Sequence, residues 1–249
     1  MSDGGFYGPD QAHIHHTAFG DLAERAATRL VAELRGSGHE AGTVVDLGCG
    51  SGILARRVSD SGYEVEGVDL SPAMLDLARR NAPQATFRRG SLLDAELPAT
   101  VAVTAIGEAL NYATDERAGD AALADVFGRV RASLEPGGIF LFDVATPGRY
   151  GPDRVANRLH DRDTWTLFMH AVESDDGRRL DRFVTIFCRT ETGSYERTDE
   201  HHVLRLYEPA MLVVSLEAAG FAVEVLDSYG APTPSTPAAG WVVILARPA

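Results

Sequence analysis

The chain has 249 residues, 45% of them hydrophobic and 24% charged, which is ordinary composition for a globular protein with a sizeable core. It carries 23 Lys and Arg against 36 Asp and Glu, so its formal net charge is −13, and no run of Lys and Arg forms a local basic patch. This balance argues against DNA, tRNA and anionic membranes as partners. Cys49 and Cys188 lie far apart and fit neither a disulfide framework nor metal-ligand spacing, so we expect no metal.

The N-terminal residues 1–16 have no apolar core of the kind that a signal peptide needs, and no segment reaches the length of a membrane span. We therefore expect a cytoplasmic protein. Glycines and Pro9 make residues 1–16 look irregular. A helix is predicted over 18–35, with Thr17 as its cap and apolar residues at helical spacing.

From residue 43 onward, short apolar runs alternate with helical stretches. Strands are predicted over 43–47, 64–70, 85–88, 101–107 and 138–144, and helices over 52–60, 72–81 and 116–134. Strands that alternate with helices pair in parallel through right-handed crossovers.

After Pro147 the pattern changes. Strands are predicted over 164–173, 180–190 and 196–207 with no helix between them, which indicates an antiparallel insert. A helix over 209–219 and strands over 221–227 and 241–246 complete the chain, and the proline-containing connection 228–240 joins the last two strands.

The strongest local signal is a glycine-rich turn after the first predicted strand. Asp46 ends that strand, and Gly48, Gly50 and Gly52 follow in the spacing G-x-G-x-G. Ile53 stands where a dinucleotide fingerprint needs a further glycine, and the absence of a Gly-Lys-Ser/Thr sequence excludes a nucleoside-triphosphate loop. Asp69 ends the next strand, where an acid accepts hydrogen bonds from both ribose hydroxyls in related nucleotide sites.

Together with the turn Leu134-Glu135-Pro136-Gly137-Gly138, these motifs resemble the class I S-adenosylmethionine-dependent methyltransferases over residues 40–146. The resemblance implies a doubly wound α/β fold with a Rossmann-like, seven-stranded, mostly parallel sheet, an N-terminal helical lid and an antiparallel β insert. We expect one domain, comprising 1–40 (lid and helix), 41–147 (cofactor-binding core), 148–207 (insert) and 208–249 (end of the core). The implied cofactor is S-adenosylmethionine, and the implied reaction is O- or N-methylation of a small metabolite or natural product.

The resemblance also assigns a cofactor site. Asp46 accepts a hydrogen bond from the ammonium group, directly or through water, and Asp69 holds the ribose. Ser91 stands where the family often has an acid, so either Ser91 or Asp94 contacts adenine, and a helix cap is the alternative for Asp94. The expected cofactor-binding residues are Tyr7, Asp46, Gly48, Cys49, Gly50, Asp69, Leu70, Ser91, Leu92 and Gly107.

The acceptor is expected at the carboxyl edge of the sheet, beyond the fourth strand. His16, Glu108 and Tyr112 are the candidate catalytic residues, because a nearby base would take the proton that an oxygen or nitrogen acceptor loses. For Tyr112 the alternative is core packing, and for His16 a solvated loop.

Five further residues are candidate acceptor contacts: Asn111, Asp143, Trp165, Phe168 and His170. Helix capping is the alternative for Asn111 and a structural hydrogen bond for Asp143. Strand alternation places Trp165, Leu167 and Met169 on one face of the insert, and Phe168 and His170 on the other. One face must pack on the acceptor or on a second subunit, which leaves a homodimer open.

Two other functions fit parts of this pattern. One is a protein of the same fold that binds S-adenosylmethionine without transferring its methyl group, for another reaction or for regulation. The other is a nicotinamide-dependent dehydrogenase, against which Ile53 and the helix-free insert argue.

Overall fold

The computed structural model describes residues 6–230 and 240–249, and within them two separate sheets form. The larger sheet has the strand order β10-β11-β5-β4-β1-β2-β3. Its strands are β1 Thr43–Leu47, β2 Glu64–Asp69, β3 Thr86–Arg89, β4 Thr100–Ala105, β5 Leu134–Ala145, β10 Phe221–Leu226 and β11 Trp241–Pro248. Only β11 runs antiparallel to its neighbours, so the predicted seven-stranded, mostly parallel sheet is confirmed in the described residues.

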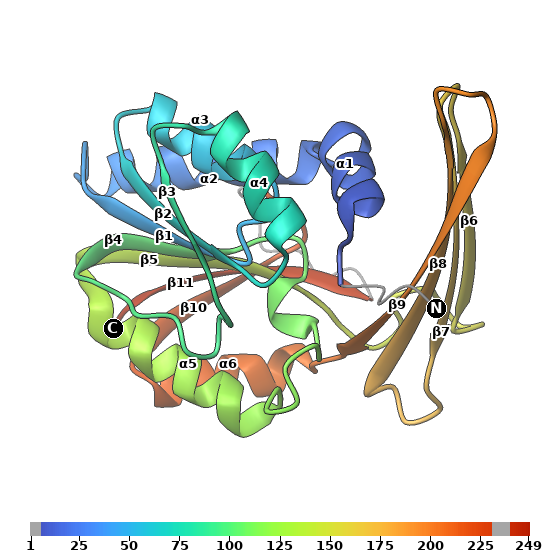
Figure 1. Ribbon diagram of the computed structural model, residues 1–249. Helices are drawn as coiled ribbons and strands as arrows, with labels where there is room; N and C mark the ends of the chain where they lie inside the picture. Colours follow the sequence, from blue (N-terminus) through green and yellow to red (C-terminus); the bar gives the residue numbers. More distant parts are fainter. Residues whose placement is uncertain (1–5, 231–239) are drawn as a thin grey trace.

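Helices cover both faces of this sheet (Figure 1). The helices α2 Asp21–Gly36, α3 Ile53–Asp60 and α4 Pro72–Asn81 lie on one face, and α5 Asp120–Ser133 and α6 Pro209–Ala218 lie on the other. The first group buries Leu30 and Leu54 against the sheet, and the second group buries Phe127 and Leu216. None of these four residues is more than 2% exposed. Burial of large apolar side chains on both faces is what drives a doubly wound sheet to form.

The insert forms a second, four-stranded antiparallel sheet that stands beside the core (Figure 1). Its strands are β6 Val155–Asp161, β7 Trp165–Glu173, β8 Arg179–Arg189 and β9 Tyr195–Arg205. The sequence predicts the last three but misses β6, whose two larger apolar residues, Val155 and Leu159, share one face with Asn157 and Asp161. The segment therefore shows no alternation of apolar and polar residues, which is the strand signal in a sequence.

The N-terminal segment contains a helix, α1 Pro9–Ala18, where the sequence predicts an irregular chain. Pro9 in the first turn and Asp10 beside it favour a helix start. The buried residues Gln11, Ala12 and Ile14 include only one large apolar side chain, so no amphipathic stripe is visible in the sequence.

Helix α1 lies between the core and the insert sheet (Figure 1). Ile14 packs against Trp165, Leu167 and Ile186 on the inner face of the insert. Thr17 does not cap the next helix, because it lies in the last turn of α1, where its hydroxyl donates to the His13 carbonyl at 3.0 Å.

Most of the connection 228–240 falls outside the described residues. Among the helices of residues 6–230 and 240–249, none combines the length and the apolar character that crossing a membrane requires.

Candidate functional site

Two cavities open at the carboxyl edge of the larger sheet. The loop cavity lies over the glycine-rich turn and is lined by Gly48, Gly50, Asp69, Ser91 and Leu92, among others. The insert cavity, of about 950 Å³, lies between the core, α1 and the insert sheet. Tyr7, His15, Gly107 and Tyr112 line both cavities. The two spaces therefore meet at a wall that these four residues form.

The glycine-rich turn packs tightly on its surroundings. Gly48 has a φ of 73°, and a Cβ there would lie 2.7 Å from the Cβ of Ala109, so a larger residue would displace the segment after β4. Gly48 and Gly50 line the loop cavity. The thiol of Cys49 is buried, which raises its pKa well above the ordinary value, and this residue lines neither cavity. Its predicted contact with the cofactor therefore stays a prediction.

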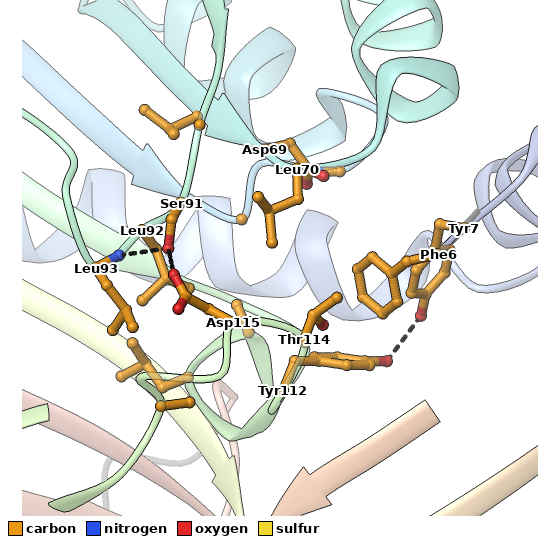
Figure 2. Close-up of a pocket in the computed structure, with 18 of the residues that line it drawn as sticks. Phe6, Tyr7, Asp69, Leu70, Ser91, Leu92, Leu93, Tyr112, Thr114 and Asp115 are labelled. Carbon is orange, nitrogen blue, oxygen red and sulfur yellow. Dashed lines mark hydrogen bonds between the residues drawn. The ribbon is translucent and has the colours of Figure 1, made fainter. Parts of the chain in front are cut away.

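Asp69 ends β2 and faces the loop cavity (Figure 2). Its two carboxylate oxygens accept hydrogen bonds from the backbone N–H groups of Gly50 and Ser71, each at 2.8 Å. Burial raises the pKa of Asp69, against the lowering effect of these backbone donors. The bonds fix the carboxylate and leave further lone pairs, so Asp69 can accept hydrogen bonds from two neighbouring hydroxyls of a ligand.

Asp46 lies one residue before the end of β1 and is only 2% exposed. Thr104 donates a hydrogen bond to its Oδ1 at 2.7 Å. Burial raises the pKa of Asp46 to about 7. Asp46 lines neither cavity. The structure therefore does not expose it for the direct ligand contact that the sequence suggests.

Ser91 and Asp115 form a polar corner of the loop cavity (Figure 2). The Ser91 hydroxyl donates to Asp115 Oδ2 at 2.7 Å, and Leu70, Leu92 and Leu93 supply apolar walls nearby. Hydrogen bonds from Arg117 and Ser91 hold the pKa of Asp115 below its usual range.

Asp94 lies outside this corner. It is exposed and binds Arg117 through two hydrogen bonds of 2.8 and 2.6 Å. Of the two predicted adenine contacts, only Ser91 therefore reaches the cavity. No sequence pattern marks Asp115, because it lies in an irregular segment that carries no motif.

Tyr7 lies in an N-terminal strap, which we define as residues 6–18, and three hydrogen bonds of Tyr7 and one of Gly8 hold it in place. Glu200 of β9 accepts from the backbone N–H groups of Tyr7 at 2.9 Å and Gly8 at 2.8 Å. The Ser71 hydroxyl donates to the Tyr7 carbonyl at 2.7 Å, and the phenol oxygen of Tyr7 lies 2.9 Å from that of Tyr112. The φ of Tyr7 is 49°, a strained value for a non-glycine residue that these bonds maintain.

Glu108 lines the insert cavity, as expected, but it is not a free base. Arg149 Nε lies 2.8 Å from one carboxylate oxygen, and Arg182 lies 2.6 Å from the other. Burial raises the pKa of Glu108, but the charges of Arg182 and Arg149 outweigh burial, so its pKa lies below the ordinary value. A carboxylate held ionised by two guanidinium groups is a poor proton acceptor.

Asp143 and Asn111 are fully buried and hydrogen-bonded within the protein. Asp143 accepts from the backbone of Gly107 and Glu108 at 2.8 and 2.7 Å, and also from Tyr229 and Trp241. Burial raises its pKa to about 6.

The side chain of Asn111 donates to the carbonyls of Ala145 and Arg205 and accepts from the Ala145 N–H. Asn111 and Asp143 line neither cavity, and their hydrogen bonds fix the loop after β4, so the structural alternatives fit both residues.

The remaining predicted residues also lie away from both cavities. His16 Nδ1 lies 3.0 Å from the Ser51 hydroxyl, in a separate surface hollow. Trp165 packs on Ile14, so the inner face of the insert covers α1. Phe168 is 43% exposed on the outer face, and there His170 bonds to Asn157 at 2.8 Å. The predicted alternation is correct, but these contacts belong to the structure of the insert.

Comparison with known proteins gives a consistent result. A family model described as a methyltransferase domain matches residues 44–138. A protein of Geobacillus sp. (strain WCH70) named as a methyltransferase is 31% identical over 209 residues, which span 77% of this chain and 79% of that protein. A dTDP-3-amino-3,6-dideoxy-alpha-D-glucopyranose N,N-dimethyltransferase of Streptomyces fradiae is 27% identical over 213 residues, which span 85% of this chain and 82% of that protein.

The fold has a match among solved structures as well. An S-adenosylmethionine-dependent methyltransferase from Clostridium acetobutylicum ATCC 824 superposes with a TM-score of 0.81 and 18% sequence identity. The superposition covers 96% of this chain and 98% of that one, so it includes the insert as well as the core.

Proposed function

The chain belongs to the S-adenosylmethionine-dependent methyltransferases of class I, and from this premise we propose that it methylates a small-molecule acceptor bound in the insert cavity. The observation that carries the proposal is the wall of Tyr7, His15, Gly107 and Tyr112 that the two cavities share. The loop cavity has the features of a cofactor site. The insert cavity has a volume of about 950 Å³, within the range of pockets for small ligands.

The residues of the loop cavity fit S-adenosylmethionine. Asp69 offers carboxylate oxygens to the ribose, Ser91 and Asp115 offer polar atoms to the adenine edge, and Leu70 and Leu92 offer apolar surface to its faces. Gly48 and Gly50 let the backbone come close to the methionine portion. When bound, this cofactor supplies a methyl group on a cationic sulfur. The sulfur leaves as part of neutral S-adenosylhomocysteine, which is a good leaving group.

The protein then contributes to the reaction mainly by positioning the acceptor against the methyl group of the cofactor. The strap and the insert enclose the junction of the two cavities, and enclosure excludes water from the reacting atoms. Burial raises the pKa of both Tyr7 and Tyr112, so each phenol stays protonated and can donate a hydrogen bond at the shared wall. Tyr112 is one of the predicted catalytic residues, and in this proposal its phenol helps to position the reactants.

The charges around the insert cavity favour an acceptor with an anionic group. Four arginines line the cavity (Arg25, Arg149, Arg158 and Arg182), against the carboxylates of Asp21 and Glu108, in a chain of net charge −13. Arg149 and Arg182 are paired with Glu108, whereas Arg25 and Arg158 have no carboxylate partner within residues 6–230 and 240–249. Their guanidinium groups suit a phosphate or a carboxylate. A nucleotide-linked sugar, as in the name of the Streptomyces fradiae relative, has such a group.

We further propose that the enzyme works in the cytoplasm on free metabolites, without nucleic acid. A homodimer stays a prediction, which light scattering of the purified protein would test.

The test is incubation with methyl-labelled S-adenosylmethionine and a metabolite library that contains matched anionic and neutral acceptors, followed by mass identification of the products. We expect label on an anionic acceptor. Binding of S-adenosylhomocysteine without transfer to any acceptor would instead support a non-methylating protein of the same fold.

A further inference from the structure

Two residues of α1 that line the insert cavity each carry a buried polar atom without a partner. The side-chain oxygen of Gln11 (Oε1) and the Nδ1 atom of His15 are buried, and neither has a hydrogen bond with any described residue. Gln11 as a whole is only 7% exposed. The two residues are four positions apart, so they lie one turn apart on the same face of the helix.

Their surroundings fix them at the junction of the two cavities. Gln11 and His15 both line the insert cavity, and His15 also lines the loop cavity. The ring of His15 lies against that of Tyr7, with centroids 5.4 Å apart at an interplanar angle of 86°. The two residues therefore lie beside the wall across which the methyl group is proposed to be transferred.

Buried polar atoms in folded proteins nearly always have a hydrogen-bond partner, so two partnerless ones on one face indicate a ligand group. Burial lowers the pKa of His15 to about 4, so its ring is neutral at physiological pH. A neutral imidazole has one bare nitrogen that accepts a hydrogen bond, and an amide oxygen is also an acceptor. With the ring proton on Nε2, Nδ1 is the bare nitrogen, and the pair then suits a group that carries two donors.

We propose that Gln11 and His15 hold the amino group of the acceptor, each accepting a hydrogen bond from one of its N–H groups. This assignment rests on the proposed function and deepens it, because it makes the methylated atom a nitrogen. An amine with both N–H groups bound keeps its lone pair free for the methyl group, whereas a hydroxyl has one hydrogen and satisfies only one of the two atoms.

The chemistry balances without a protein base. The acceptor nitrogen bonds to the methyl carbon with its lone pair, the electrons of the broken carbon–sulfur bond stay on sulfur, and the ammonium product loses its proton to bulk water once it has left the site. His15 does not hold that proton, because its pKa of about 4 is too low.

The contact can be tested without knowing the acceptor. The probe is an analogue of S-adenosylmethionine in which nitrogen replaces sulfur and carries a 2-aminoethyl chain, so that an amine extends beyond the methyl position. A second analogue with an n-propyl chain lacks the donor. Titration calorimetry measures the dissociation constants of both probes and of S-adenosylhomocysteine.

We compare Gln11→Leu and His15→Phe, which remove the hydrogen-bond acceptors, with His15→Asn, whose amide lies near the position of Nδ1. His13→Phe is the matched control, because His13 is exposed on the same helix and lines neither cavity. We expect Gln11→Leu and His15→Phe to weaken binding of the aminoethyl probe about tenfold, as the loss of a buried hydrogen bond predicts. The propyl probe and S-adenosylhomocysteine should bind as before, His15→Asn should retain most of the affinity, and His13→Phe should change nothing.

Equal binding of the aminoethyl probe by the wild-type protein and both variants would overturn the assignment. So would an equal loss of both probes, which would indicate a packing role for the two residues. If the wild-type protein binds not even S-adenosylhomocysteine, the proposed function fails, and this assignment fails with it.

Discussion

The phenol oxygens of Tyr7 and Tyr112 lie 2.9 Å apart, and this hydrogen bond joins the N-terminal strap to the segment after β4 (Figure 2). The two residues are 105 positions apart in the chain. Because both line the loop cavity and the insert cavity, the bond lies at the junction of the two spaces. The strap thus completes the junction at which cofactor and acceptor are proposed to meet.

Removing either hydroxyl should impair turnover more than cofactor binding. We expect Tyr7→Phe and Tyr112→Phe each to lower kcat/KM about fivefold, since each loses one buried hydrogen bond worth about 1 kcal/mol. The double variant should lose little more than one single variant, because the two hydroxyls are partners. Tyr195→Phe, at an exposed position on β9, is the control. Strictly additive losses would show that the hydroxyls act independently.

Asp69 should be required for cofactor affinity. Asp69→Ala removes the carboxylate that is proposed to accept from two ribose hydroxyls, and we expect binding of S-adenosylhomocysteine to weaken by about 2 kcal/mol. Asp76→Ala, an exposed acid on α4, is the control for the loss of charge. Titration calorimetry gives both values. An unchanged dissociation constant in Asp69→Ala would remove this residue from the ribose site.

The contribution of Asp46 to the stability of the ligand-free protein should fall as the pH rises from about 4 to about 7. Burial raises the pKa of Asp46 to about 7 in the folded protein, against an ordinary value of 3.8, so the folded state binds a proton more tightly than the unfolded state. The stabilisation is therefore complete below the ordinary value and is lost as the pH rises through 7, at up to about 1.4 kcal/mol per pH unit. Asp143 contributes in the same direction up to about pH 6.

Urea unfolding at pH 5 and pH 8 tests this dependence on Asp46. Asp46→Asn cannot ionise, so we expect its free energy of unfolding to change less between the two pH values than that of the wild-type protein. Asp60→Asn, at an exposed surface position, should keep the full dependence. An identical slope in Asp46→Asn and the wild-type protein would contradict the raised pKa.

The strap should loosen when its anchor on the insert is weakened. Glu200 is 7% exposed and accepts from two backbone N–H groups, while its Oε2 also lies 2.8 Å from His202 Nε2. Glu200→Gln replaces one oxygen with a donor, so we expect a loss of about 1–3 kcal/mol in the local stability of the strap. Hydrogen exchange should become faster in residues 7–18 and stay unchanged in β1. Glu196→Gln, exposed on the same strand, should exchange like the wild-type protein.

Much of the fold follows from local patterns in the sequence. Alternation of buried strands with helices predicts the parallel core, and a serine–proline pair marks the start of α4, where the Ser71 hydroxyl accepts from the Met74 N–H. The sequence also places Asp69 at the end of β2 and the glycine turn before α3, because their spacing is set within one strand–turn–helix unit.

The rest of the site depends on contacts that sequence spacing does not reveal. Glu200 anchors a residue 193 positions away, and Asp115 reaches the loop cavity from an irregular segment. Asp143 and Asn111 lie at the expected edge of the sheet, but their side chains bond to neighbouring backbone. Position along a strand therefore predicts the edge, whereas the direction of the side chain and its partners decide whether it meets a ligand.

The two faces of the insert should differ in their effect on the acceptor. Met169 and Phe168 are neighbours on β7, but Met169 lines the insert cavity, and Phe168 is 43% exposed on the outer face. We expect Met169→Ala to raise the KM of the acceptor several-fold, because it removes apolar surface and the contact of its sulfur with the Tyr150 hydroxyl. Phe168→Ala should leave that KM unchanged, and neither substitution should alter binding of S-adenosylhomocysteine, whose proposed contacts lie in the loop cavity.

Initial rates with an acceptor found by the labelled-methyl screen give the comparison. If Phe168→Ala changes the KM as much as Met169→Ala does, the outer face also takes part in acceptor binding. Light scattering of both variants would then show whether it acts through a second subunit.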